Sequence, residues 1–148
     1  MHPTEEIIDL INRSLQSFQT IPEEAWSAKK SPTVWSKREL LGHLIDSAMN
    51  NLRRFVVSQY EPAPHVVYDQ EAWVALQDYQ HADTQELILL WQLLNQQLVR
   101  TVNRISDEQM LLTCNTSKEG APELRTLHYL VEDYVVHLKH HLQQLAHR

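Results

Sequence analysis

The helix that decides the fold begins with SKRELLGHLIDS, residues 36–47, and the rest of the chain is organised around it. Ser36 and Glu39 have the spacing of a capping box, in which the serine oxygen accepts one free backbone N–H and the glutamate accepts another. Apolar side chains then recur at helical spacing until EPAP, residues 61–64, ends the pattern. The spacing predicts a helix from the cap to about Gln59.

Three further stretches have the apolar periodicity of long helices, and they span about Thr4–Gln19, Asp83–Val102 and Glu123–His147. The connection over residues 61–82 is long, which allows the helices on either side of it to run parallel. There is no convincing series of strands. The pattern therefore predicts an all-α fold, a four-helix bundle with a long crossover between helices 2 and 3. We expect one domain over residues 1–148.

Shorter segments between these helices carry weaker signals. Single helical turns are expected at about residues 23–28, 70–76 and 106–111. Residues 112–122 are polar and contain Gly120, so they are predicted to form either a loop or a small hairpin.

Composition and charge narrow the range of functions. The 148 residues carry 13 Lys and Arg against 19 Asp and Glu, a formal charge of −6. Because nucleic acids and anionic membranes are bound through basic patches, we expect neither as a partner. The acidic start does not resemble a signal peptide, and no apolar run approaches the roughly 20 residues of a spanning helix. A single cysteine excludes an internal disulfide, so we expect a cytoplasmic protein.

Histidine is the unusual residue, with nine copies. At about 100° per residue, His137 and His141 lie one turn apart on the apolar side of the last helix, whereas His140 points away. His43 lies beside the apolar stripe of the helix that begins at residue 36. We predict that His43, His137 and His141 meet in the core as a metal site. The alternative is that they are ordinary helix histidines bonded to their neighbours. The remaining histidines have the positions of solvated residues: His2, His65, His81, His128 and His147.

Three neutral imidazoles suit Zn²⁺ or Ni²⁺ better than Mg²⁺ or Ca²⁺, which prefer oxygen ligands. Three protein ligands also leave positions open to water or substrate, as in catalytic sites. Asp46 and Asp133 lie within about one turn of these histidines, either as acceptors or bases for the site or as solvated acids. Arg53 and Arg54 have two interpretations, contact with an anionic part of a substrate or plain surface positions. Cys114 is interpreted as a loop residue rather than a nucleophile.

Three motifs resemble those of the DinB-like superfamily, and in particular its YfiT-like branch, to which bacillithiol S-transferases belong. They are WSKRELLGHLIDS at 35–47, YDQEAW at 68–73 and YVVHLKHH at 134–141. The resemblance implies a four-helix bundle in which His43, His137 and His141 hold a divalent metal, zinc or nickel. It also implies a homodimer, which is common in the family. His140 matches a histidine that is common in the family but does not bind the metal.

Three functional hypotheses follow. The first is a metal-dependent S-transferase, which joins a low-molecular-weight, bacillithiol-like thiol to an electrophile. The second is a metal-dependent hydrolase that uses a metal-bound water. The third is a non-catalytic, metal-binding bundle. The first two share every predicted ligand, so the residues do not separate them, and we assign no general base.

Overall fold

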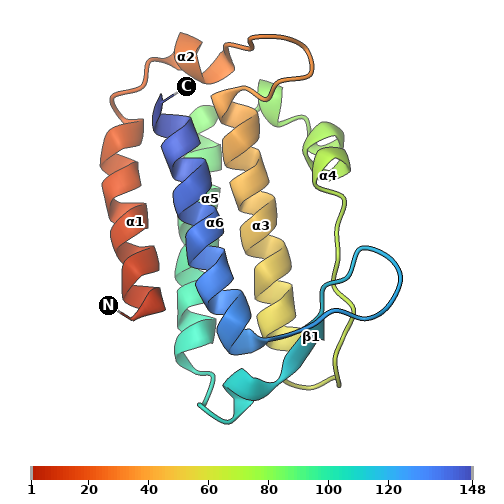
Figure 1. The fold of residues 1–148 in the computed structure, drawn as a ribbon. Helices are drawn as coiled ribbons and strands as arrows, with labels where there is room; N and C mark the ends of the chain where they lie inside the picture. Colours follow the sequence, from red (N-terminus) through yellow and green to blue (C-terminus); the bar gives the residue numbers. More distant parts are fainter. Residues whose placement is uncertain (1, 148) are drawn as a thin grey trace.

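Four long helices form the body of the protein in the computed structural model, which describes residues 2–147. The long helices are α1 (Pro3–Phe18), α3 (Lys37–Val57), α5 (Thr84–Asn103) and α6 (Leu127–His147). The shorter helices are α2 (Glu23–Ser27), α4 (Gln70–Gln77), η1 (Tyr79–His81) and η2 (Gln109–Leu111). In Figure 1, α1 and α6 run upwards while α3 and α5 run downwards. The predicted four-helix bundle, with parallel helices on either side of a long crossover, is confirmed.

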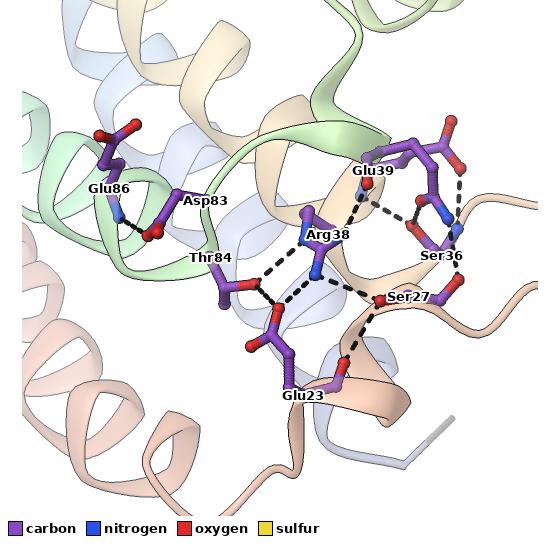
Figure 2. A network of polar contacts seen from close by, with 9 residues as sticks. Glu23, Ser27, Ser36, Arg38, Glu39, Asp83, Thr84 and Glu86 are labelled. Carbon is purple, nitrogen blue, oxygen red and sulfur yellow. Dashed lines mark hydrogen bonds and ion pairs between the residues drawn. The ribbon is translucent and has the colours of Figure 1, made fainter.

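The two parallel helices begin at caps that the sequence predicts. Ser36 Oγ accepts the backbone N–H of Glu39, and Glu39 Oε1 accepts the backbone N–H of Ser36, each at 3.1 Å. At the start of α5, Asp83 Oδ1 accepts the backbone N–H of Glu86 at 3.0 Å, as Figure 2 shows. These bonds satisfy backbone donors that have no partner inside the helix, and they define where α3 and α5 start.

The crossover between α3 and α5 passes along the outside of the bundle and carries α4 and η1 (Figure 1). Its close approach to α3 depends on Gly42, because a Cβ at that position would lie 2.1 Å from Cδ2 of Tyr79. A side chain there would push η1 away from α3. Gly42 therefore allows the crossover to pack directly against the helix that carries His43.

A small hairpin precedes the last helix. Strand β1 (Thr113–Asn115) pairs antiparallel with β2 (Leu124–Thr126), which confirms the hairpin alternative for residues 112–122. Helix α6 therefore begins at Leu127, and the prediction of a helix from about Glu123 is wrong. The reason is that three residues of strand are too short to show a two-residue alternation, so nothing in the sequence of β2 separates it from the helix that follows.

The core is apolar and draws on all four long helices. Fully buried side chains include Ile7, Leu40, Ile45, Trp91, Leu98, Leu127 and Leu138. Cys114 is also completely buried, so its interpretation as a polar loop residue is wrong. Its thiol donates to the carbonyl oxygen of Pro64 at 3.3 Å, and burial raises the pKa of this thiol, which disfavours a nucleophilic thiolate. Within residues 2–147, no helix combines the length and apolarity needed to cross a membrane.

A network of polar contacts, here called the polar junction, joins α2, α3, η1 and α5 (Figure 2). At its centre, Arg38 is 7% exposed and forms an ion pair with Glu23. The same guanidinium donates to Thr84 Oγ1 at 3.0 Å, to the carbonyl oxygen of Gln80 at 2.5 Å and to Ser27 Oγ at 3.2 Å. Thr84 in turn donates to Glu23 Oε1 at 2.7 Å. All three nitrogens of the Arg38 guanidinium therefore donate hydrogen bonds at this junction.

Candidate metal centre

Three histidines from two helices converge in the bundle. His43 comes from α3, and His137 and His141 come from successive turns of α6. Their ligand atoms all lie within 4.8 Å of one another. The ring centroids are 5.3 Å apart for His43 and His137, 4.8 Å for His43 and His141, and 4.4 Å for His137 and His141. The structure thus brings together the three residues that the sequence singled out.

His43 shows why this cluster fits a metal ion. The residue is 1% exposed, and neither of its ring nitrogens has a hydrogen-bond partner within residues 2–147. A buried polar atom without a partner costs about 1–3 kcal/mol. A divalent ion accepts the lone pair of a neutral imidazole and would supply the partner that the protein does not.

The spacing of the two α6 histidines fits as well. Nε2 of His137 and Nε2 of His141 are 3.0 Å apart. Two nitrogens that each lie about 2.0–2.1 Å from one ion, at an angle of about 90–110°, are separated by roughly 2.8–3.4 Å. The pair therefore already has the separation of two ligands of one metal.

Gln144 orients one of these rings. Its Oε1 accepts from Nδ1 of His141 at 2.8 Å, and its Nε2 lies 3.3 Å from Nε2 of His140. An amide oxygen only accepts, so Nδ1 of His141 carries the proton, and Nε2 presents its lone pair to the cluster. His140 lies beside His141, with ring centroids 5.1 Å apart, but it is exposed and is not one of the three clustered ligands, in agreement with the prediction that it points away.

The environment keeps two of the rings neutral. Burial, together with repulsion from the neighbouring imidazoles of His141 and His137, lowers the pKa of His43 to about 3. Burial also lowers the pKa of His137 to about 4, with added repulsion from His141 and His140. Both side chains are therefore unprotonated at pH 7, which is the form that binds a metal.

The cluster is covered on one side and open on another. The Trp35 ring lies over His43, with centroids 5.1 Å apart and planes inclined by 32°. His137 and His141 are half-buried, and His137 lines a pocket of about 130 Å³. The pocket wall comes from α3, α6, the start of the crossover and the hairpin loop. A small molecule can therefore approach His137 from solvent.

The two carboxylates considered as partners for the histidines have other positions. Asp46 is fully buried, and its Oδ1 accepts from the hydroxyl of Tyr79 at 2.6 Å and from Nε2 of Gln77 at 2.8 Å. Burial raises the pKa of Asp46, and the carboxyl makes no bond to His43. Asp133 is exposed and lines the pocket beside His137. Of the two, only Asp133 faces the space in front of the cluster.

Sequence patterns did not assign a role at the site to several residues that the structure places there. Gln144 follows His141 by three residues, so a search for acceptors at helical spacing would have found it. Tyr68 and Lys118 also line the pocket, yet they come from the crossover and the hairpin loop, where no periodicity marks them. Arg54 lines the pocket as well, whereas Arg53 is exposed and does not.

Most other histidines do lie on the surface, but they have local partners. His65 Nε2 is 2.7 Å from the carbonyl oxygen of Ser117, and His81 Nδ1 is 2.8 Å from Asp78 Oδ1. On α6, Nε2 of His128 is 3.3 Å from a carboxylate oxygen of Glu132. None of these residues belongs to the three-histidine cluster, as predicted.

Comparison with known proteins gives a consistent family. The family model described as the DinB superfamily matches residues 7–145. A protein of Bacillus subtilis (strain 168) named "Putative metal-dependent hydrolase YfiT" is 31% identical over 118 residues, which is 76% of this chain and 62% of that protein. The match therefore spans less than two thirds of that relative. A "Putative metal-dependent hydrolase" of Bacillus cereus (strain 03BB102) is 25% identical over 143 residues, 96% of this chain and 80% of that one.

Two solved structures have the same fold. The structure of YfiT from Bacillus subtilis, described as a probable metal-dependent hydrolase with an unusual four-helix bundle topology, matches with a TM-score of 0.85. It is 24% identical, and the match covers 97% of this chain and 83% of that one. A DinB-like protein of Bacillus subtilis has a TM-score of 0.66 at 16% identity, with 98% and 87% coverage.

Proposed function

This chain belongs to the DinB superfamily, and from that premise we propose that it is a metal-dependent enzyme acting on small molecules at the three-histidine cluster. One observation carries the proposal: a fully buried His43, neither of whose nitrogens has a partner among residues 2–147, faces two imidazoles spaced as ligands of one ion. The relatives named for metal-dependent hydrolysis support the same conclusion. We propose His43, His137 and His141 as the metal ligands.

Each residue has a separate task at this centre. The three imidazoles hold the ion, Gln144 keeps the Nε2 lone pair of His141 directed at it, and Trp35 shields His43 from water. When bound, zinc or nickel supplies Lewis acidity, which lowers the pKa of a coordinated water or thiol. Asp133, in the pocket wall, is the carboxylate in position to take up a proton from substrate.

The reaction has two candidate forms. The names of the relatives favour hydrolysis. The similarity of the helix motifs to those of bacillithiol S-transferases favours transfer of a low-molecular-weight, bacillithiol-like thiol to an electrophile, and we propose this transfer as the first reaction to test. Both reactions use the same ligands and the same open pocket. We also propose a homodimer, on the family resemblance alone.

The deciding experiment combines metal analysis with turnover. Purified protein should contain about one equivalent of divalent metal, and His43→Ala, His137→Ala and His141→Ala should each lose it. His128→Ala is the matched control, because it removes an exposed histidine from the same helix. Metal retained in all three ligand variants would contradict the site.

Turnover then separates the reactions. The metal-loaded protein is incubated with an activated aryl halide or a nitrophenyl ester, each with and without a low-molecular-weight thiol. Product that forms only with thiol supports the transferase, and product that forms without thiol supports the hydrolase. No product under any of these conditions, from a protein that binds metal, would favour the non-catalytic bundle.

A further inference from the structure

The pocket beside His137 extends away from the histidine cluster along α3. His43, Ser47, Asn51 and Arg54 recur at helical spacing, so they lie on nearly the same face of that helix. The last three line the pocket together with His137. With a rise of about 1.5 Å per residue, Arg54 lies roughly 16 Å along the helix from His43. The pocket thus joins the proposed metal site to a distant arginine.

Arg54 is held in place without an acidic partner. Its Nε and Nη2 donate to the carbonyl oxygen of Val66 at 3.2 and 3.0 Å, and its Nη1 donates to Asn51 Oδ1 at 3.4 Å. Among the described residues, no carboxylate lies within ion-pair distance of this half-buried guanidinium. A guanidinium has five N–H donors, so two remain available. The side chain is therefore preorganised, with an uncompensated charge.

The neighbours of Arg54 narrow the class of ligand. Lys118, from the hairpin loop, adds a second cation that lines both this pocket and the adjoining groove. Asp133, in the same wall, opposes a strongly charged dianion such as phosphate. A singly charged, planar group with two acceptor oxygens best suits the two free donors, one on Nη1 and one on Nη2. That description fits a carboxylate.

We propose that Arg54, assisted by Lys118, binds a carboxylate of an elongated substrate whose reacting group lies at the opposite end, beside His137. This inference rests on the proposed function, because it takes the histidine cluster as the reacting end. It makes Arg54 a specificity-determining residue. Remote anchoring of this kind positions the reacting end without touching it.

The test uses metal-free, ¹⁵N-labelled protein and two small probes of equal shape, propionate and uncharged propionamide. We expect propionate to shift the Nε–H resonance of Arg54 and the side-chain amide of Asn51 in a saturable way. Propionamide should require at least about tenfold higher concentration, because it cannot form a charge-assisted bond. Equal binding of the two probes would overturn the proposal.

Substitutions then show which residues bind propionate. Arg54→Gln should weaken propionate binding about tenfold or more, whereas Arg53→Gln, at the exposed neighbouring position, should leave it unchanged. Lys118→Gln should weaken it about two- to threefold, as expected for an exposed cation. Lys118 makes no bond that the fold needs, so this variant decides the matter if Arg54→Gln fails to fold. Undiminished propionate binding in folded Arg54→Gln, or in Lys118→Gln alone, would contradict the assignment.

Failure of this inference can be told apart from failure of the proposed function. The probes are measured without metal, so a protein that binds no divalent ion but prefers propionate through Arg54 would refute the enzyme and keep the carboxylate site. A protein that binds metal and turns over substrate, yet shows no charge preference at Arg54, would do the reverse.

Discussion

Arg38 and His43 are five residues apart on α3, and both are buried, yet their surroundings are opposite. Arg38 is 7% exposed and bonded to four other residues of the polar junction (Figure 2). His43 is 1% exposed, and neither ring nitrogen has a partner in the part of the chain that the structure describes. A buried polar group that is fully bonded holds helices together. One that lacks every bond costs free energy, and the proposed function gives a reason for that cost at His43, since a bound metal ion would bond to its ring.

The largest expected effect is the stabilisation of the fold by a metal ion bound at the histidine cluster. Free metal at about 1,000 times Kd should stabilise the fold by about 4 kcal/mol. For a chain of this size that is a rise in Tm of about 8–16 °C, measured by circular dichroism before and after chelation. His43→Ala should show almost none of this rise. The same rise in His43→Ala would place the metal elsewhere.

At the polar junction, by contrast, removal of the buried polar group should lower the free energy of unfolding. Arg38→Met removes a buried guanidinium and leaves Thr84 and the carbonyl oxygen of Gln80 without their donor, so we expect a loss of about 2 kcal/mol in the free energy of unfolding. Urea denaturation of metal-free protein measures it. Arg53→Met, at an exposed position of the same helix, should change stability by less than about 0.5 kcal/mol. A loss of similar size in that control would mean that the junction is not special.

The next effect concerns metal affinity, and it compares two neighbouring glutamines of α6. Gln144→Ala should weaken metal binding about 10- to 100-fold, because His141 loses the acceptor that fixes its tautomer. Gln143→Ala, at the exposed position beside it, should leave the affinity unchanged. Competition with a chromophoric chelator measures both. Equal affinities for the two variants would show that Gln144 does not orient the ring.

The smallest expected effect is a change in stability at pH 7, and we expect it to be a gain rather than a loss. In metal-free protein, His43→Leu should raise the free energy of unfolding by about 1 kcal/mol, because it removes two unsatisfied nitrogens and keeps the volume of the side chain. The same substitution abolishes metal binding. Urea denaturation at pH 7 decides the sign, and a clear loss of stability would mean that the ring has bonds that the structure does not show.

The pH dependence of the same variant gives an independent check. Burial holds the pKa of His43 near 3 in the folded protein, below its value of about 6.5 in the unfolded chain. Below about pH 6.5 the unfolded chain therefore binds a proton that the folded protein does not, and stability falls as the pH drops towards 3. His43→Leu should show a shallower fall than the wild type over this window.

Much of the fold could be predicted from local patterns. The capping box at Ser36, the Asp83 cap, the apolar stripes and the length of the crossover indicated four helices and the parallel pair, because each depends on residues close in sequence. The hairpin shifted the start of α6 to Leu127, since pairing between β1 and β2 is a contact between separate segments. Cys114 lies in a polar stretch, but it is buried and its thiol donates to Pro64 of the crossover, which is again a contact between separate segments.

The sequence by itself determined that His137 and His141 share one face of a helix, since a helical turn is a local property. It also made His43 the best third candidate. Only the tertiary structure decided that His43 has no partner among the described residues, and that Gln144 rather than Asp46 bonds to a ring of the cluster. It also decided that Arg54 faces a pocket while Arg53 faces solvent. The physical reason is that burial and unpaired hydrogen-bonding groups are set by packing between helices, and packing is not encoded in the spacing of any one of them.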